Sequence, residues 1–305
     1  MIQVFGHKAP DTDSTGSPLI WAWYLSDVRK TPAKAVLQGT PNTEAVWMLG
    51  HWGVDMPEII DDIAPGTQCV IVDTNNPAEL PASLADAEVI EIIDHHLLAG
   101  GIKTRLPINI TIRPLACTAT IMHDLIGADL DRAPRWVKGL MLTCILSDTL
   151  EFRSPTTTPH DRWVAEKLAK DLDLSIPAFA TEMFTAKSDV SAFSDAALLK
   201  MDSKEYELGG KKMRISVLET TAPQVLIDRK ASLMAAMPAV AAEDGADEVM
   251  LFIVDILNEQ STLLLPNDFV RGVATASFGI PATGDSVVLP GIVSRKKQII
   301  PALKV

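Results

Sequence analysis

The sequence predicts an α/β protein: a parallel-sheet domain with helices on both faces, followed by a smaller α/β domain. From Met1 to Ile126, short apolar runs alternate with segments of helical periodicity. This βαβ order builds a parallel sheet covered by helices. The composition then becomes small and polar at KSDVSAF, residues 187–193, and a second α/β series follows. We therefore expect domains over residues 1–188 and 195–305, joined by a linker at 189–194.

The expected elements of the first domain follow from the period of the apolar residues and from the prolines that break or begin helices. Strands are expected at residues 2–5, 35–38, 69–72 and 88–93, with an edge strand at 107–113. Helical segments are expected at 17–28, 43–52, 77–85, 117–127, 134–148, 158–172 and 177–184.

The second domain has the same alternation of apolar runs and helical segments. Its first helix should end near Met201, and a long helix should cover residues 229–243. Strands are expected at 204–208, 212–219, 248–256 and 261–265, and the chain closes with GIVSRKKQIIPAL at 291–303.

The composition excludes some classes of protein. The chain has 305 residues and a formal net charge of −12, which argues against a nucleic-acid surface because phosphate backbones bind clustered Lys and Arg. Its apolar stretches are shorter than the roughly 18 residues of a membrane helix, and Met1 leads directly into a strand. We therefore expect a cytoplasmic protein without membrane contact. The separated cysteines, Cys69, Cys117 and Cys144, predict buried thiols rather than disulfides or a thiolate metal site.

Acidic and imidazole side chains recur where expected strands end. GHKAPDTDST places His7, Asp11 and Asp13 on a loop between a strand and a helix, with Asp13 as the expected helix N-cap. Asp73 follows the strand CVIV, and Asp94-His95-His96 follows EVIEII. The carboxyl ends of parallel strands meet at one edge, where ligands bind. Mixed nitrogen and oxygen donors suit Mn, Co, Fe or Zn, so the pattern predicts a multi-metal hydrolytic centre.

Six motifs share their order with a known family. They are GHKAPDTD, Asp73 after a strand, IIDHHLLAG, LSDTLEFRSPTTT, MDSKEYELG and VSRKKQIIPAL. Together they resemble the family II, manganese-dependent inorganic pyrophosphatases of the DHH phosphoesterase superfamily, over nearly the whole chain. The resemblance implies a metal-binding catalytic DHH domain, a C-terminal substrate-binding domain and an active site in the cleft between them. It also implies hydrolysis of pyrophosphate to two phosphates, two Mn²⁺ ions per chain (replaceable by Co²⁺ or Mg²⁺) and a homodimer.

The resemblance assigns metal ligands residue by residue. One ion would be held by His7, Asp11 and Asp73. The ligands implied for the second ion are Asp13, Asp73, His95 and Asp148. Asp73 would then bridge the ions, and metals about 3.5 to 4 Å apart can share a water and supply a hydroxide nucleophile. Without the resemblance, Asp148 would be interpreted as a solvated acid at a helix end, and Asp13 as a cap.

Other residues are expected to orient ligands or bind substrate. Asp94 should orient a ligand imidazole. Neighbours on an extended chain point in opposite directions, so we assign His95 to metal and His96 to the substrate or leaving group. The resemblance assigns Lys204, Arg295 and Lys296 to the phosphate groups, whose charge needs fixed cations beside an acidic site. The alternative interpretation of SRKKQ is a solvated basic run, and Lys297 is expected to face solvent.

Two other functions remain open on the sequence. One is an exopolyphosphatase or a phosphodiesterase for short oligonucleotides within the same superfamily, although no Gly-rich GGGH-like motif is present. The other is a non-catalytic phosphate or nucleotide sensor. Its only support is the third motif, where the family usually has Asp-His-Asn-Glu and this chain has Asp73-Thr74-Asn75-Asn76. Asp73 is kept while residues beside it differ, which should change metal affinity and rate more than the reaction.

Overall fold

A computed structural model describes residues 1–305, which divide into two compact units, Met1–Lys187 and Ser188–Val305. Each unit is a sheet packed with helices, which confirms the predicted α/β class. None of the helices is long and apolar enough to cross a membrane.

The first unit contains a six-stranded sheet in the order β3-β2-β1-β4-β5-β6, and all of its pairings are parallel. The strands are β1 Ile2–Phe5, β2 Ala33–Leu37, β3 Glu58–Ile59, β4 Gln68–Val72, β5 Glu88–Asp94 and β6 Asn109–Ile112. β6 is an edge strand, as expected. The short β3 forms the other edge and is not predicted from the sequence, because two exposed residues carry no periodic signal.

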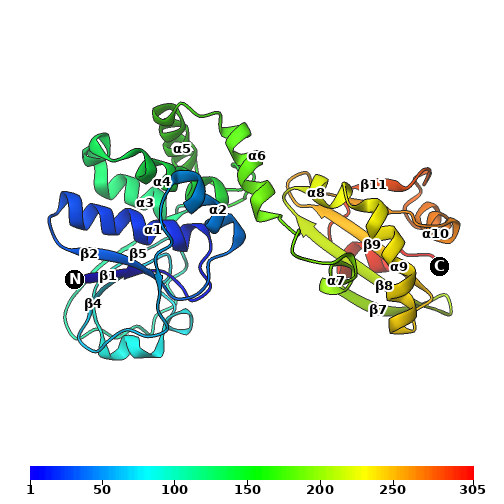
Figure 1. Cartoon of the computed structure of the whole chain (residues 1–305), viewed down its shortest axis with the longest axis horizontal. Coiled ribbons are helices and arrows are strands. Elements are labelled where there is room, and N and C mark those ends of the chain that lie inside the picture. The colour runs from blue at the N-terminus through cyan, green and yellow to red at the C-terminus, as the bar shows by residue number, and fades with distance from the viewer. The chain divides into compact units, whose positions relative to one another are not determined.

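Helices of the first unit cover the sheet unequally. They are α1 Thr12–Trp23, η1 Tyr24–Val28, α2 Thr43–Trp52, η2 Pro77–Glu79, η3 Ala82–Asp86, α3 Thr118–Ile126, η4 Gly127–Arg132, α4 Arg135–Asp148, α5 Pro159–Leu172 and α6 Ile176–Lys187. α1 and α3 contact the strands, and α4 packs on α1 and α5. Figure 1 shows α1, α3 and α4 on one side of the sheet. On the other side, Leu80 and Leu84 pack against the sheet residues Phe5 and Ile71, so short 3-10 helices and loops cover that face.

The second unit contains a mixed five-stranded sheet in the order β11-β10-β9-β8-β7, in which only the β8–β9 pairing is parallel. Its strands are β7 Ser203–Leu208, β8 Lys211–Thr220, β9 Glu248–Asp255, β10 Gln260–Leu264 and β11 Ser286–Pro290. Its helices are α7 Asp195–Met201, α8 Pro223–Ile227, α9 Lys230–Asp244, α10 Asp268–Phe278, η5 Arg295–Ile299 and α11 Ile300–Ala302. α8, α10 and β11 are not predicted from the sequence.

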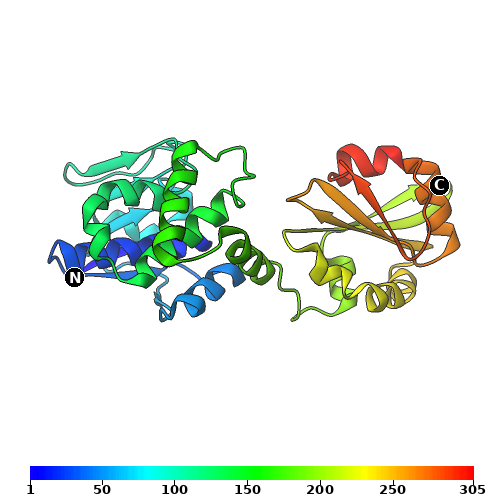
Figure 2. The ribbon, with the colours of Figure 1, turned by 90° about the horizontal axis from the view of Figure 1, so that it is seen from above.

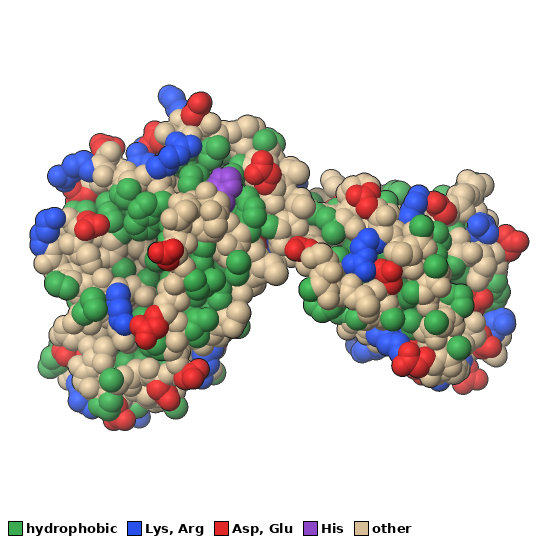
Figure 3. All heavy atoms as spheres, in the orientation of Figure 1, with side chains coloured by type: hydrophobic (Ala, Val, Ile, Leu, Met, Phe, Trp, Pro, Cys, Tyr) green, Lys and Arg blue, Asp and Glu red, His purple; other side chains and the backbone are tan.

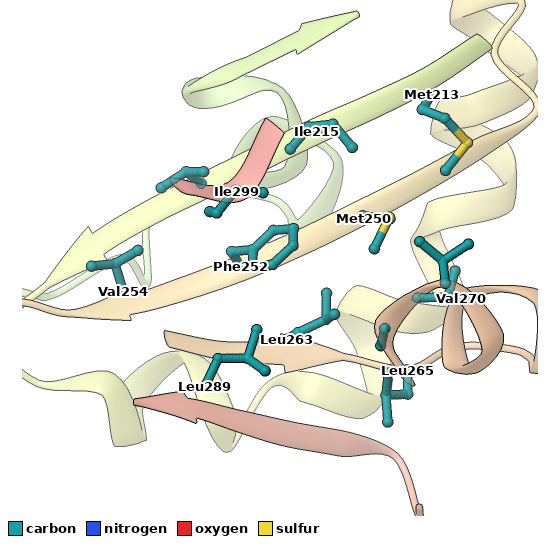
Figure 4. Close-up of a cluster of buried hydrophobic side chains, with 13 residues drawn as sticks. Met213, Ile215, Met250, Phe252, Val254, Leu263, Leu265, Val270, Leu289 and Ile299 are labelled. Atoms are coloured by element: carbon teal, nitrogen blue, oxygen red, sulfur yellow. The ribbon is translucent and has the colours of Figure 1, made fainter. Parts of the chain in front are cut away.

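Both faces of this second sheet are covered. Figure 2 shows it between the yellow helices α8 and α9 and the orange and red segments α10 and η5. On the first face, Leu233 and Met237 of α9 pack on Leu251. On the second face, Val270 of α10 and Ile299 of η5 join Phe252 in a buried apolar cluster, drawn in Figure 4. Ile299 is fully buried, so it anchors the segment that carries the basic SRKKQ motif.

Candidate metal centre

The loop after β1 brings His7 and Asp11 together. Asp11 is the N-cap of α1: its Oδ1 accepts a hydrogen bond from the Ser14 amide at 2.9 Å, and its Oδ2 lies 3.7 Å from Nε2 of His7. The His7 amide donates to Ser14 Oγ at 2.8 Å. This close approach requires Gly6, because a Cβ there would lie 1.9 Å from that oxygen. One carboxylate can therefore cap the helix and still offer an oxygen to a cation.

Asp13 is not the N-cap that the sequence analysis expected. It lies inside the first turn of α1 and is 1% exposed. Its Oδ1 accepts from Ser17 Oγ at 2.6 Å, and its Oδ2 accepts from the Thr118 amide at the start of α3 at 2.7 Å. The helix begins earlier than predicted, so the capping position falls to Asp11. Asp13 is thereby held on two sides inside the fold.

Asp73 lies immediately after β4 and faces both imidazoles. Its Oδ2 is 3.6 Å from Nε2 of His7, and its Oδ1 is 3.4 Å from Nε2 of His95. Thr118 Oγ1 donates to Oδ1 at 3.1 Å. Asp73 has φ 59° and is 1% exposed. A left-handed backbone at a non-glycine residue is costly and is often found at functional sites. The two oxygens of this buried carboxylate face different imidazole nitrogens.

The two histidines after β5 are oriented by different groups. His95 Nδ1 lies 3.1 Å from the carbonyl oxygen of Leu115. Donation from Nδ1–H to that carbonyl leaves the lone pair of Nε2 on the side of Asp73. Asp94 accepts instead from Nδ1 and the amide of His96, at 2.9 and 3.0 Å. Asp94 therefore orients His96, and the Leu115 carbonyl orients His95, the imidazole assigned to metal from the sequence.

The two rings also lie closer together than strand alternation predicts. Their centroids are 4.2 Å apart, and Nδ1 of His96 is 3.9 Å from Oδ1 of Asp73. β5 ends at Asp94 and the chain bends at His96, so the alternating geometry of an extended strand does not apply there. The His96 side chain is 52% exposed and is accessible to a ligand.

Asp148, the last residue of α4, lies beside Asp13 and Cys117. One ligand atom from each of these residues lies within 4.8 Å of the others. The Asp148 Oδ2 is shielded from solvent and has no hydrogen-bond partner within the protein. All three cysteines are buried and free, as predicted. The position of the Cys117 thiol next to this acidic pair is not predicted from the sequence, since nothing local in the sequence indicates that α3 and α4 meet there.

The electrostatics of the site follow from the crowding of its carboxylates. Burial and the neighbouring charges, that of Asp13 first, raise the pKa of Asp73 well above its ordinary 3.8. The pKa of Asp148 is raised in the same way by burial and by Asp13. Burial alone would lower the pKa of His7, but its interaction with Asp11 raises it. Without bound cations, the acids of this site repel each other.

The residues that depart from the family's third motif have defined partners. Thr74 Oγ1 donates to Glu79 Oε2 at 2.6 Å, and Thr74 is buried. Asn75 Nδ2 donates to Asp94 Oδ2 and, at 3.0 Å, to the carbonyl of Leu97, while its Oδ1 accepts from the Ala99 amide at 2.7 Å. Asn75 therefore holds the loop that carries His95 and His96, and Thr74 fixes the side chain of Glu79.

The expected cations of the second unit, Lys204, Arg295 and Lys296, line one open pocket together with Asp202. Asp202 holds Arg295 by both prongs: Nη2 lies 2.7 Å from the carboxylate, and Nη1 donates to the backbone carbonyl at 2.8 Å. The Arg295 side chain is 15% exposed, so it is not part of a solvated tail. Within the motif, Ser294 caps η5 and Gln298 accepts from the amides of Val293 and Ser294 at 2.9 Å.

Elsewhere the surface carries mixed charge. On the face shown in Figure 3, Lys and Arg side chains are scattered among Asp and Glu side chains. The positive charge at the pocket is therefore local, in a chain whose net charge is −12.

Two domain families match the chain in order. Residues 1–147 match the DHH family, N-terminal domain, and residues 181–305 match the DHHA2 domain. The fold and the acid and histidine cluster thus define a DHH–DHHA2 protein, a class with a parallel-sheet unit followed by a mixed-sheet unit.

Similar proteins narrow this class. The Deinococcus radiodurans protein named "Probable manganese-dependent inorganic pyrophosphatase" is 37% identical over 310 residues, with 100% of this chain and 98% of the relative covered. An Enterococcus faecalis protein of the same name is 32% identical over 303 residues, with 99% and 97% covered. A solved structure described as "Crystal structure of Methanococcus jannaschii putative family II inorganic pyrophosphatase" has 32% sequence identity and a TM-score of 0.62, with 99% of this chain and 98% of that chain covered. The chain belongs to the family II manganese-dependent inorganic pyrophosphatases, which are hydrolases.

Proposed function

We propose that this protein hydrolyses inorganic pyrophosphate to two phosphates with two manganese ions bound in the first unit. The observation that carries the proposal is the orientation of Asp73, whose Oδ2 faces His7 while its Oδ1 faces His95. A carboxylate held in this way can serve two cations at once. The names of the full-length relatives agree with the substrate and the metal.

The residues present fit a pair of divalent ions. Three groups of side chains lie close enough to hold a cation, and two of them contain Asp73. The groups are His7 with Asp11 and Asp73, Asp73 with His95 and His96, and Asp13 with Cys117 and Asp148. We propose that His7, Asp11 and Asp73 hold one ion. The ligands proposed for the other are Asp13, Asp73, His95 and Asp148. The unpartnered oxygen of Asp148 and the raised pKa values of Asp73 and Asp148 fit a site in which cations offset the acids.

The bound ions supply Lewis acidity, which lowers the pKa of water and neutralises phosphate oxygens. The protein's own contribution begins with His96. Asp94 accepts a hydrogen bond from its Nδ1 and raises its pKa, so the imidazolium is favoured. We propose that His96 contacts a phosphate oxygen and supplies a proton to the leaving group.

The second unit offers three cationic side chains for binding the substrate. Lys204 and Lys296 offer compact charges, whereas the Arg295 guanidinium offers a planar fork for phosphate oxygens. Asp202 fixes the orientation of that fork in the pocket. We propose that these three residues bind the anionic substrate and thereby give preference for a bare phosphate chain over a nucleotide.

The decisive experiment measures phosphate release from pyrophosphate, tripolyphosphate and a dinucleotide, each with manganese, cobalt, magnesium or zinc. We expect rapid turnover of pyrophosphate, with manganese or cobalt as the best metals. Faster hydrolysis of tripolyphosphate would favour an exopolyphosphatase, and cleavage of the dinucleotide would favour a phosphodiesterase. Binding of phosphate without turnover of any substrate would favour a sensor. Full activity of a chelator-stripped sample would rule out the two-ion proposal.

The oligomeric state is a separate proposal. We propose a homodimer formed through the β6 edge of the first sheet, where Ile110 is 58% exposed. An exposed edge strand can pair with a second copy. Light scattering of the wild type and of Ile110→Lys tests this, and a monomeric wild type would contradict it.

A further inference from the structure

Glu44 links two segments that carry proposed metal ligands. It lies in the first turn of α2 and is fully buried. Its Oε2 accepts hydrogen bonds from Thr12 Oγ1 at 2.8 Å and from Ser147 Oγ at 2.7 Å. Thr12 stands between Asp11 and Asp13 in the sequence, and Ser147 precedes Asp148. One carboxylate oxygen therefore connects the loop after β1 to the end of α4.

Lys187 supplies the positive charge for this carboxylate. Its Nζ lies 3.1 Å from Oε2 of Glu44, and its backbone carbonyl accepts from Thr43 Oγ1 at 3.4 Å. Burial raises the pKa of Asp11, but the hydrogen bonds with His7 and Ser14 lower it, and the Lys187 charge adds a smaller lowering. The ammonium therefore acts on Glu44 and on a proposed metal ligand together.

A purely structural role does not explain this arrangement well. An acid in the first turn of a helix interacts favourably with the helix dipole even when it is exposed to solvent. Burying it costs desolvation, which an ion pair seldom offsets by much compared with apolar residues of the same volume. In addition, Glu44 Oε1 is buried without a hydrogen-bond partner. The arrangement is costly for stability, and it is centred on the hydroxyls next to three proposed ligands.

We propose that Glu44 is a positioning residue of the metal centre and that Lys187 supports it through the ion pair at Oε2. This inference rests on the two-ion function proposed above. The Oε2 oxygen accepts from both hydroxyls at once and so holds Asp11 and Asp13 at a set separation from Asp148. A neutral amide at this position offers a weaker acceptor, and the two segments would be free to separate.

The test is a titration of Mn²⁺ into metal-stripped protein, with free Mn²⁺ followed by electron paramagnetic resonance. The variants are Glu44→Gln, Lys187→Met and the double variant. We expect each single change to weaken Mn²⁺ binding at least about tenfold, the size typical of residues that orient metal ligands. The double variant should be little worse than either single variant, because the two residues act as a pair.

The matched control is Glu91→Gln. Glu91 is a half-buried carboxylate of the same unit that accepts from Trp21 Nε1 at 2.9 Å, and its loss should leave Mn²⁺ affinity unchanged. Thermal unfolding of each stripped variant reports stability separately. A Glu44→Gln protein that unfolds at a lower temperature but binds Mn²⁺ within twofold of wild type would overturn the proposal.

Two milder variants decide the matter if Glu44→Gln does not fold. Thr12→Val and Ser147→Ala each remove one donor to Glu44 and should each weaken Mn²⁺ binding severalfold. Unchanged affinity in both would overturn the proposal. The titration is independent of turnover, so a wild-type protein that binds Mn²⁺ without hydrolysing pyrophosphate would refute the proposed reaction and still permit this test.

Discussion

Asp73 and His95 face each other at the edge of the first sheet, with Oδ1 of Asp73 3.4 Å from Nε2 of His95. They follow the neighbouring strands β4 and β5, whose carboxyl ends meet there. The Leu115 carbonyl fixes the His95 ring, and the other Asp73 oxygen faces His7. Asp73 thus turns one oxygen toward each of these two imidazoles.

The first prediction concerns this central position of Asp73. Asp73→Ala removes a donor from both proposed ions, so it should abolish tight binding of both and lower kcat/KM by more than roughly 100-fold, beyond the cost of a residue that only orients a ligand. His7→Ala should weaken the binding of one ion and leave the second ion bound. Mn²⁺ titration of the stripped proteins measures both effects. Equal loss of metal in the two variants would contradict the bridging role.

The second prediction concerns the metal-free protein and pH. The pKa of Asp73 is raised in the folded state, so its contribution to stability is fully present below pH 3.8 and is lost as pH rises through the raised value. Asp73→Asn mimics the protonated acid. At pH 8 the metal-stripped variant should therefore have a higher Tm than the metal-stripped wild type. The difference should be about 2 to 4 °C if relief of repulsion stabilises the fold by on the order of 1 kcal/mol.

This difference should shrink toward pH 5, where the wild-type acid is protonated more often. Saturating Mn²⁺ should reverse the order at pH 8, because the wild type binds the ions more tightly. Calorimetric scans at both pH values, with chelator and with Mn²⁺, provide the measurement. A variant that is less stable than wild type in chelator at pH 8 would argue against charge repulsion in this site.

The third prediction concerns the pair Asp94 and His96. The carboxylate of Asp94 raises the pKa of His96. Asp94→Asn should lower that pKa, so the protonated imidazole is lost at a lower pH. The loss of kcat on the alkaline side should move to lower pH, and Mn²⁺ stoichiometry should stay normal. His96→Gln should remove this pH-dependent step altogether. Identical pH profiles for wild type and Asp94→Asn would exclude His96 as the proton donor.

The fourth prediction concerns Arg295. If its guanidinium binds the phosphoryl group, Arg295→Ala should lower kcat/KM by on the order of 2 to 4 kcal/mol, with normal metal content. Arg295→Lys should recover only part of the loss, because an ammonium has no planar fork. Asp202→Asn should weaken the orientation of the guanidinium and raise KM. Lys297→Ala is the matched control, since Lys297 is an exposed neighbour that does not line the pocket. Wild-type kinetics for Arg295→Ala would return the motif to a solvated role.

Local patterns account for most of what the sequence predicts. Strands β1, β4 and β5 appear as short apolar runs, and the long helices show helical spacing, because both periodicities depend only on neighbouring residues. The same patterns did not lead us to the exposed β3 or to α8, α10 and β11 of the second unit. They also place the N-cap of α1 at Asp13 instead of Asp11, because both residues favour that position.

The sequence by itself determined which residue types follow the strand ends, and motif order placed the chain in its family. Only the tertiary structure decided which side chains meet. Asp148, Cys117, Leu115 and Glu44 reach the site from segments far apart in the sequence. Their meeting depends on how helices pack on the sheet, and packing is set by the complementary shapes of many side chains rather than by any local period.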